Sequence, residues 1–221
     1  MIEVRNLTVS YGENTARGSI RFKWKNGQKY GICGKSNAGK TALLDHLAGA
    51  CPCEREAVLI NGFDMNSEPM KAREFIGYVP KESALYPDMT PVEYLMYVAD
   101  VKGMGYEKAI RTVSNLLDVT GVSPRRDCLI ANLSSVEKRC IAIAQAVLGK
   151  SDILIFDDPW HGLSARDAQK ITELVQVVSE GATVIVSARN DAELQKICDA
   201  VFLLEGGVLN EITVSEKEDM N

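Results

Sequence analysis

A glycine-rich segment that ends in a lysine and a threonine has the residue types and spacing of a phosphate-binding loop. Residues 34–41 read GKSNAGKT and match the pattern G-x-x-x-x-G-K-[ST]. Glycines let backbone N–H groups curl around phosphate oxygens, and the start of a following helix adds a favourable partial charge. We expect Lys40 to reach the β- and γ-phosphates and the Thr41 hydroxyl to bind Mg²⁺. The alternative is a glycine-rich turn that only caps a helix. The nucleotide-binding candidates are Gly34, Lys35, Ser36, Asn37, Ala38, Gly39, Lys40 and Thr41.

Two aspartates follow the apolar segment 153–156 and can supply the acidic groups that work beside a phosphate loop. A carboxylate at the end of a buried strand is what holds Mg²⁺ in such a site. Asp157 is therefore the candidate metal ligand. Asp158 is the candidate catalytic carboxylate, nearest to the attacking water. The alternative is a solvated pair of aspartates after a strand.

Alternating strands and helices are expected to position these residues. Residues 1–30 read as short strands with turns at Tyr11-Gly12 and Asn26-Gly27. A strand at 30–33 leads into the loop, and a helix follows from about Lys40. The later pattern predicts strands at 58–60 and 76–79, a helical block from 91 to about 148 that ends with a helix over 134–148, a strand at 153–156, a helix near 165–180, a strand at 183–187 and a last helix near 191–198.

Composition argues against several classes of partner and location. The 221 residues include 25 Lys and Arg and 30 Asp and Glu, for a net charge of −5. This balance argues against nucleic acid as a partner, because neutralising phosphates requires concentrated Lys and Arg. The sequence has no apolar run of the roughly 18 residues that a membrane helix needs, and its start lacks the apolar core of a signal peptide. We expect a cytoplasmic protein that reaches a membrane only through a partner.

Taken together and in this order, these segments resemble the nucleotide-binding subunit of an ABC transporter over nearly the whole chain. Tyr11 stands at the position of the aromatic residue that stacks on adenine in this family. Lys81 ends the segment IGYVPK, which is similar to the segment that carries the family's Gln loop. The segment LSSVE at 133–137 replaces the signature LSGGQ and begins 24 residues before Asp157. Arg189 falls at the position of the family's switch histidine.

The resemblance implies an α/β P-loop NTPase fold of the ABC ATPase type, with a RecA-like core, an N-terminal antiparallel β subdomain and an inserted α-helical subdomain. It implies one ATP-binding domain over 1–221, with the core at about 1–82 and 150–221 and the helical subdomain at about 83–149. In the family, two such subunits sandwich two ATP molecules and the helical block contacts a membrane permease. The segment LYPDMT at 85–90 is similar to subunits that serve multi-span export permeases, which favours an exporter.

Three departures from the family affect the residues expected to act in hydrolysis. Asp158 replaces a glutamate, and displacing a carboxylate by about 1 Å from the water it must polarise costs on the order of 100-fold in rate. Lys81 replaces a neutral amide, and a cation cannot ligate Mg²⁺ although it can contact a γ-phosphate. Arg189 replaces a histidine, and a guanidinium can clamp phosphate but cannot relay a proton. A solvated surface position is the alternative for both cations.

The signature-like segment departs in a way that bears on the ATP held by a partner subunit. Ser135 and Val136 add side chains where glycines would let a helix N-terminus approach that γ-phosphate closely. Ser134-x-x-Glu137 also fits a capping box, which uses the free N–H groups of the helix internally. The Glu137 carboxylate would oppose an approaching phosphate. We therefore expect Ser134, Ser135, Val136 and Glu137 to form a better-capped helix and a weaker contact with ATP.

Two further features have no role assigned by the sequence. His161 lies just past the two aspartates, and a role near the γ-phosphate is the alternative to a surface position. Cys51-Pro52-Cys53 has no second Cys or His pair at metal-ligand spacing. We expect all six cysteines to be free thiols.

The leading hypothesis is an ATP-binding subunit of an ABC-type exporter that binds Mg-ATP and hydrolyses it slowly. It would dock on the cytoplasmic face of a membrane permease as a homodimer or as a heterodimer with a second ATP-binding subunit. The alternatives are a non-hydrolysing ATP-dependent regulatory or interaction subunit and a free-standing soluble ABC ATPase. The 24-residue spacing from Leu133 to Asp157 disfavours a P-loop nucleotide kinase.

Overall fold

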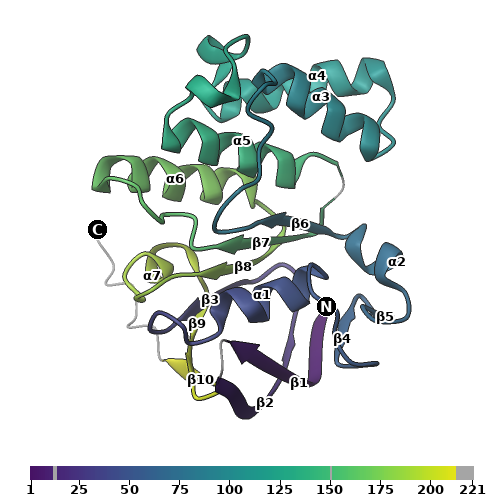
Figure 1. The fold of residues 1–221 in the computed structure, drawn as a ribbon, viewed down its shortest axis with the longest axis vertical. Helices are drawn as coiled ribbons and strands as arrows, with labels where there is room; N and C mark the ends of the chain where they lie inside the picture. The colour runs from purple at the N-terminus through teal and green to yellow at the C-terminus, as the bar shows by residue number, and fades with distance from the viewer. Residues whose placement is uncertain (12–13, 150, 213–221) are drawn as a thin grey trace.

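The chain folds around two β-sheets with one helix between them. The computed structural model describes residues 1–11, 14–149 and 151–212, with the side chains of residues 9–18 excepted. Helix α1 (Lys40–Ala48) lies between the two sheets, and further helices cover the other face of the larger sheet (Figure 1). The layers therefore alternate sheet, helix, sheet and helices.

The larger sheet has six strands in the order β10-β9-β3-β8-β7-β6. All neighbouring pairs from β9 to β6 are parallel, and only β10 pairs antiparallel. The carboxyl ends of the parallel strands consequently meet at one edge, which is where α/β sheets bind ligands. The strand bounds are β3 Lys29–Cys33, β6 Ile76–Val79, β7 Ile153–Asp157, β8 Thr183–Ser187, β9 Ala200–Glu205 and β10 Val208–Ile212.

Both faces of this sheet are buried, as its central strands show. In β7, Ile153 and Ile155 join the apolar core that includes α1, whereas Leu154 and Phe156 join the core on the opposite face. Side chains alternate between the faces of a strand, so a run of apolar residues fits a strand covered on both sides. This burial fixes the position of the residue that ends β7.

The smaller sheet is antiparallel and packs on the other side of α1. Its order is β2-β1-β4-β5. The bounds are β1 Ile2–Tyr11, β2 Asn14–Trp24, β4 Val58–Ile60 and β5 Phe63–Asp64. The pairing of the long strands β1 and β2 shifts register along its length. The predicted β-rich start and the turn at Asn26-Gly27 are confirmed, but the two strands are long rather than short. The turn predicted at Tyr11-Gly12 includes residue 12, which lies outside the described residues.

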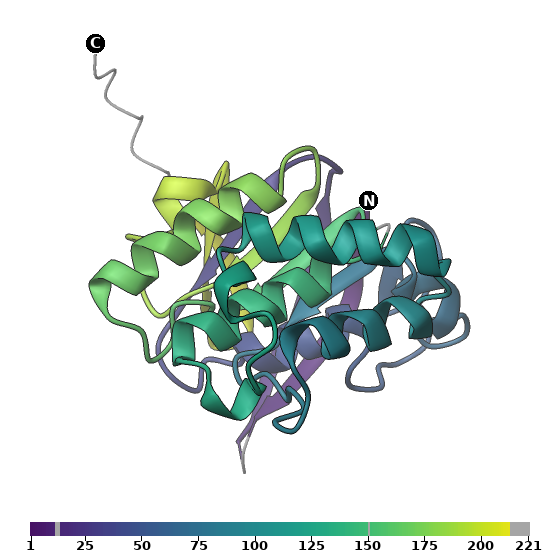
Figure 2. The same ribbon diagram turned by 90° about the horizontal axis from the view of Figure 1, so that it is seen from above.

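The remaining helices pack mainly on the face of the larger sheet opposite α1. Helix α5 (Ser135–Val147) and helix α6 (Ala165–Val178) lie nearest the sheet, and α3 (Pro91–Val101) and α4 (Tyr106–Val119) lie side by side outside α5 (Figures 1 and 2). The short elements are α2 Pro69–Arg73, α7 Leu194–Ile197 and the 3₁₀ turns Ser123–Arg125 and Ile130–Asn132. In the described part of the chain, no helix is both long and apolar enough to cross a membrane.

The end of the chain differs from the sequence-based expectation. The last helix, predicted near 191–198, is only the four-residue α7, because residues 191–193 form a turn and the helix begins at Leu194; it ends near the predicted position, where the chain becomes extended at Cys198. The hairpin of β9 and β10 was not predicted, although Gly206-Gly207 between two apolar runs is a hairpin signal. The α/β class with an inserted helical block is confirmed, and the subdomain boundaries stay a prediction.

Gly77 allows α5 to approach β6 closely. A Cβ atom at this position would lie 2.1 Å from the Ala146 carbonyl oxygen of α5 and 2.9 Å from a Leu154 methyl group. Backbone atoms of a packed helix cannot move aside as a flexible side chain would. The contact between α5 and the sheet therefore requires a glycine here.

We predict that Gly77→Ala lowers the free energy of unfolding by at least about 2 kcal/mol, because the new methyl group overpacks this contact. The matched control is Gly105→Ala, since a Cβ at Gly105 would meet no atom within 4 Å. Urea denaturation of both variants measures the difference. Equal unfolding free energies would contradict the packing argument.

Candidate functional site

The glycine-rich segment forms a loop that curls around its own lysine. The loop connects β3 to α1, and Asn37 and Gly39 have positive φ angles of 65° and 94°. The Lys40 ammonium donates to the carbonyl oxygens of Gly34 (2.6 Å) and Lys35 (3.0 Å). A Cβ atom on Gly34 would lie 2.7 Å from the Leu204 carbonyl oxygen, so the start of the loop packs directly on β9.

Burial lowers the pKa of Lys40, while the negative charges of Asp158 and Asp157 oppose that shift. These two carboxylates lie across a cavity of about 380 Å³ from the loop. Cations and carboxylates thus converge on one space at the carboxyl edge of the sheet. The cavity is lined by Ser36, Asn37, Ala38, Gly39, Lys40, Thr41, Ala42, Asp45, Lys81, Asp157, Asp158 and Arg189.

Asp157 ends β7 and is 1% exposed. Its Oδ1 atom accepts a hydrogen bond of 2.6 Å from the Ser187 hydroxyl. Its Oδ2 atom is buried and has no hydrogen-bond partner among the described residues. Buried carboxylate oxygens rarely lack a partner, and hard cations such as Mg²⁺ are bound by oxygen ligands. Asp157 and Thr41, which line the same cavity, therefore fit the predicted Mg²⁺ ligands.

Asp158 has a left-handed backbone conformation, with a φ of 45°. Its N–H group donates to both the Ser187 carbonyl oxygen (3.2 Å) and the Ser187 hydroxyl (3.0 Å), which hold the backbone in this conformation. Non-glycine residues rarely adopt this region, and functional sites are where such conformations gather. The backbone thus orients the carboxylate toward the cavity edge, where two nitrogen atoms meet it.

Lys81 and His161 both contact the Asp158 carboxylate. The Lys81 Nζ atom and the His161 Nδ1 atom each lie 3.5 Å from the same oxygen, Oδ2. One of the two oxygens of this carboxylate is therefore already paired with two nitrogen-bearing side chains. The sequence predicted Asp158 and Lys81 as separate site residues, assigned no role to His161 and did not predict that the three meet.

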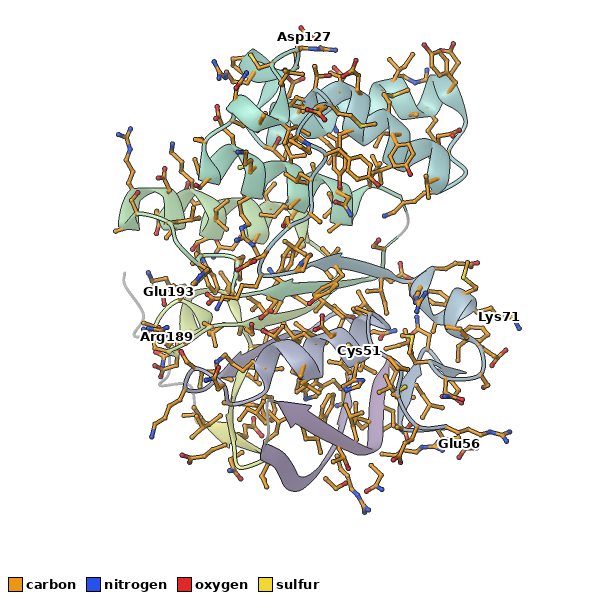
Figure 3. The ribbon with its side chains drawn as sticks, viewed as in Figure 1. Cys51, Glu56, Lys71, Asp127, Arg189 and Glu193 are labelled. Carbon is orange, nitrogen blue, oxygen red and sulfur yellow. The ribbon has the colours of Figure 1, made fainter. Side chains whose placement is uncertain are left out.

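Arg189 connects the segment after β8 to the phosphate loop. Its Nη2 atom donates to the Ser36 hydroxyl at 3.0 Å. Figure 3 places Arg189 beside the loop that precedes α1, whereas Cys51 lies past the opposite end of that helix. All six cysteines are free, and Cys51 is not part of the cavity.

The capping box predicted at the start of α5 is confirmed. The Glu137 N–H donates to the Ser134 hydroxyl at 3.3 Å, and the Ser134 N–H donates to the Glu137 carboxylate at 2.7 Å. Hydrogen bonds from Ser134 hold the pKa of Glu137 below its usual range. Ser135 and Val136 follow in the first turn, and residues 134–137 do not line the cavity of this chain. Their predicted contact with a partner's ATP stays a prediction.

Two residues of the site were not predicted, and one predicted residue lies outside the described part. Ser187 pairs in register with Asp157 across β7 and β8, a relation that only the sheet order reveals. Asp45 accepts a hydrogen bond of 2.7 Å from the Tyr78 hydroxyl and lines the cavity one helical turn after Thr41. The side chain of Tyr11, expected to stack on adenine, is among those not described.

Comparisons with known proteins agree with this arrangement. The family model described as ABC transporter matches residues 18–161. The linearmycin resistance ATP-binding protein LnrL of Bacillus subtilis (strain 168) is 30% identical over 221 residues, which are 100% of this chain and 70% of that protein. The Nod factor export ATP-binding protein I of Burkholderia orbicola (strain AU 1054) is 28% identical over 207 residues, 93% of this chain and 68% of that protein.

An import protein and two solved structures are also similar. The ribose import ATP-binding protein RbsA of Streptococcus agalactiae (serotype V) is 29% identical, over 94% of this chain and 44% of its own length. A dimeric ATP-binding cassette in a post-hydrolysis state with ADP and Pi aligns with a TM-score of 0.86 and 22% identity over 97% of this chain and 99% of that chain. An ATP-binding subunit of an ABC transporter aligns at 0.84 and 24% identity, over 97% and 90%. At these identities the structures support the fold.

We predict that Glu137→Gln lowers the free energy of unfolding by about 0.5–1 kcal/mol at neutral pH, because it removes the charge from the capping box. Since the folded-state pKa of Glu137 is lowered, its contribution is complete above the carboxyl pKa of the unfolded chain and is lost as the pH falls through the folded-state value. The difference between wild type and variant should therefore shrink in acid. Urea denaturation at pH 7 and near pH 3.5 measures it, and a constant difference would contradict the assignment.

Proposed function

The chain belongs to the ABC transporter family, and on this premise we propose that it is the ATP-binding subunit of a membrane exporter that binds Mg-ATP and hydrolyses it slowly. The observation that carries the proposal is the cavity in which the phosphate loop faces the unpartnered Asp157 oxygen. A triphosphate needs a cradle of N–H groups, cations and a metal ligand in one place.

The described contacts suggest how ATP enters this cavity. Lys40 is held by loop carbonyls and would exchange them for phosphate oxygens. Thr41 and Asp157 would hold Mg²⁺, which supplies positive charge beside the β- and γ-phosphates when bound. Arg189 donates a hydrogen bond to the Ser36 hydroxyl, and its remaining N–H groups can donate to phosphate. Lys81 would contact the γ-phosphate from the opposite side.

Slow hydrolysis follows from the surroundings of Asp158. The carboxylate is short, and its Oδ2 atom already pairs with Lys81 and His161. To polarise a water molecule through Oδ2, it must loosen at least one of these contacts. General bases have to lie within hydrogen-bond reach of the proton they accept, so both features reduce the rate.

The signature-like segment supports a dimer as the working form. In this arrangement residues 134–137 of one subunit face the ATP held on the phosphate loop of the other. Ser135 and Val136 add bulk there, and the capping box uses N–H groups that would otherwise point toward phosphate. A homodimer would carry these changes at both sites, whereas a heterodimer would carry them at one.

The permease partner and the direction of transport are supported by the helical block and by the relatives. Tyr86 packs edge-on against Tyr94, with Tyr97 beside it, and Tyr86 and Tyr97 are 46% and 45% exposed. Nearby on α3, Val101 borders an open cavity of about 710 Å³ that Met70 and Phe75 also line. Exposed aromatic side chains of this kind favour a protein partner. Of the relatives named above, this chain covers most of the length of two, and these are a resistance protein and an export protein.

The proposal is tested by single-turnover hydrolysis of Mg-ATP by the purified chain. We expect slow but measurable turnover in the wild type and a loss on the order of 100-fold in Asp158→Asn, since the general base is removed. Asp158→Glu should accelerate turnover by about 10-fold or more, because the longer side chain reaches the water. Asp127→Asn is the matched control, because Asp127 is 87% exposed and lies at the far end of the molecule (Figure 3).

Bound ATP that persists in both the wild type and Asp158→Glu would favour the non-hydrolysing regulatory subunit. Absence of ATP binding would contradict both functions. Because binding and turnover are measured on the same sample, the three outcomes are distinct.

A second experiment tests the permease. We expect the tagged chain, purified from detergent-solubilised membranes of the organism that makes it, to carry with it a protein of several membrane-spanning helices. The double variant Tyr86→Ser/Tyr97→Ser should retain several-fold less of that protein. Val177→Ser is the control, since Val177 is 62% exposed on α6. Purification without a membrane protein would favour the free-standing ABC ATPase.

A further inference from the structure

Arg139 makes an unusual contact with the loop that carries Lys81. Its Nη1 atom donates to the Pro80 carbonyl oxygen at 3.2 Å, and its Nη2 atom donates to the Lys81 carbonyl oxygen at 2.8 Å. One guanidinium thus holds two successive carbonyl groups just after β6 ends at Val79. The planar guanidinium presents its donors in a rigid fork, which suits two neighbouring carbonyl groups.

The cost of placing Arg139 here shows that the contact is specific. The residue is half-buried on α5, and burial lowers the pKa of its guanidinium against the opposing charges of Asp158 and Asp157. Within the described residues, no carboxylate lies within ion-pair distance of it. Partly buried cations are destabilising unless hydrogen bonds compensate them, and here the two loop carbonyls provide these bonds.

The contact links two parts of the candidate site that are distant in sequence. Arg139 lies in the second turn of α5, two residues after Glu137 of the capping box. On the other side of the link, the Lys81 ammonium lies 3.5 Å from the Asp158 carboxylate. Because the fork fixes the backbone from which the Lys81 side chain extends, the position of α5 determines where that ammonium lies.

We propose that Arg139 is a positioning residue that holds the Pro80–Lys81 backbone so that the Lys81 ammonium reaches the γ-phosphate of bound ATP. The inference rests on the proposed function, in which Lys81 contacts that phosphate. It also gives α5 a direct influence on the cavity, since a shift of this helix moves Lys81 with it. Arg139 itself does not line the cavity.

The test compares the affinities of Mg-AMP-PNP, which has a γ-phosphate group and resists hydrolysis, and Mg-ADP, which has none. We expect Arg139→Gln to weaken AMP-PNP binding by about 5-fold and to change ADP binding by less than about 2-fold. The two nucleotides should differ because only AMP-PNP has the γ-phosphate group that Lys81 would contact. Arg139→Lys should lose about 2- to 3-fold for AMP-PNP, because it keeps the charge but lacks the rigid planar fork that orients both carbonyl groups. Isothermal titration calorimetry measures these affinities.

A double-mutant cycle shows whether Arg139 acts through Lys81. In the Lys81→Ala background, Arg139→Gln should cause no further loss of AMP-PNP affinity, since the ammonium it positions is absent. Arg111→Gln is the charge-matched control, because Arg111 is exposed on α4. Urea denaturation checks that each variant is folded, and Arg139→Lys carries the test if Arg139→Gln does not fold.

Three results would overturn the inference while the proposed function stands. These are equal losses for AMP-PNP and ADP, full affinity in Arg139→Lys, and the same loss for Arg139→Gln in both backgrounds. Failure of the wild type to bind either nucleotide would overturn the proposed function and the inference together.

Discussion

The hydrogen bond from the Ser187 hydroxyl to Asp157 fixes the charge around which the rest of the site is arranged. It is possible because β7 and β8 are parallel, in register and buried on both faces, so that the two side chains end at the same edge of the sheet. One Asp157 oxygen is satisfied, and the other has no hydrogen-bond partner among the described residues and can bind a cation. The same Ser187 also accepts the N–H group of Asp158, and one residue thereby orients two successive carboxylates.

The unusual residues of the site compensate one another. A shortened acid beside the cavity would be an unpaired negative charge, and Lys81 supplies a cation at 3.5 Å. His161 stands at the same distance from the same oxygen. A neutral amide at position 81 could not neutralise Asp158. The Lys81 ammonium can pair with the Asp158 carboxylate and can also leave it to pair with a phosphate. In the proposed function, this pairing is what slows the use of Asp158 as a base.

Local patterns in the sequence predicted the parts of the site that depend on neighbouring residues. The phosphate loop, the aspartates after a buried strand and the capping box of Ser134 and Glu137 are all defined within a few residues. The sequence could not predict Ser187 beside Asp157 or Arg139 on the Lys81 loop, because both depend on which strand and which helix are neighbours in space. The β9–β10 hairpin is a different case, because its Gly206-Gly207 turn is a local signal from which the hairpin could have been predicted.

The capped start of α5 connects these features. Ser134 and Glu137 satisfy each other's N–H groups, which stabilises the helix and places a carboxylate where a partner's phosphate would approach. Two residues later, Arg139 holds the loop of Lys81. Under the proposed function, the changes in the signature-like segment and those around Asp158 act in the same direction, because each would slow hydrolysis.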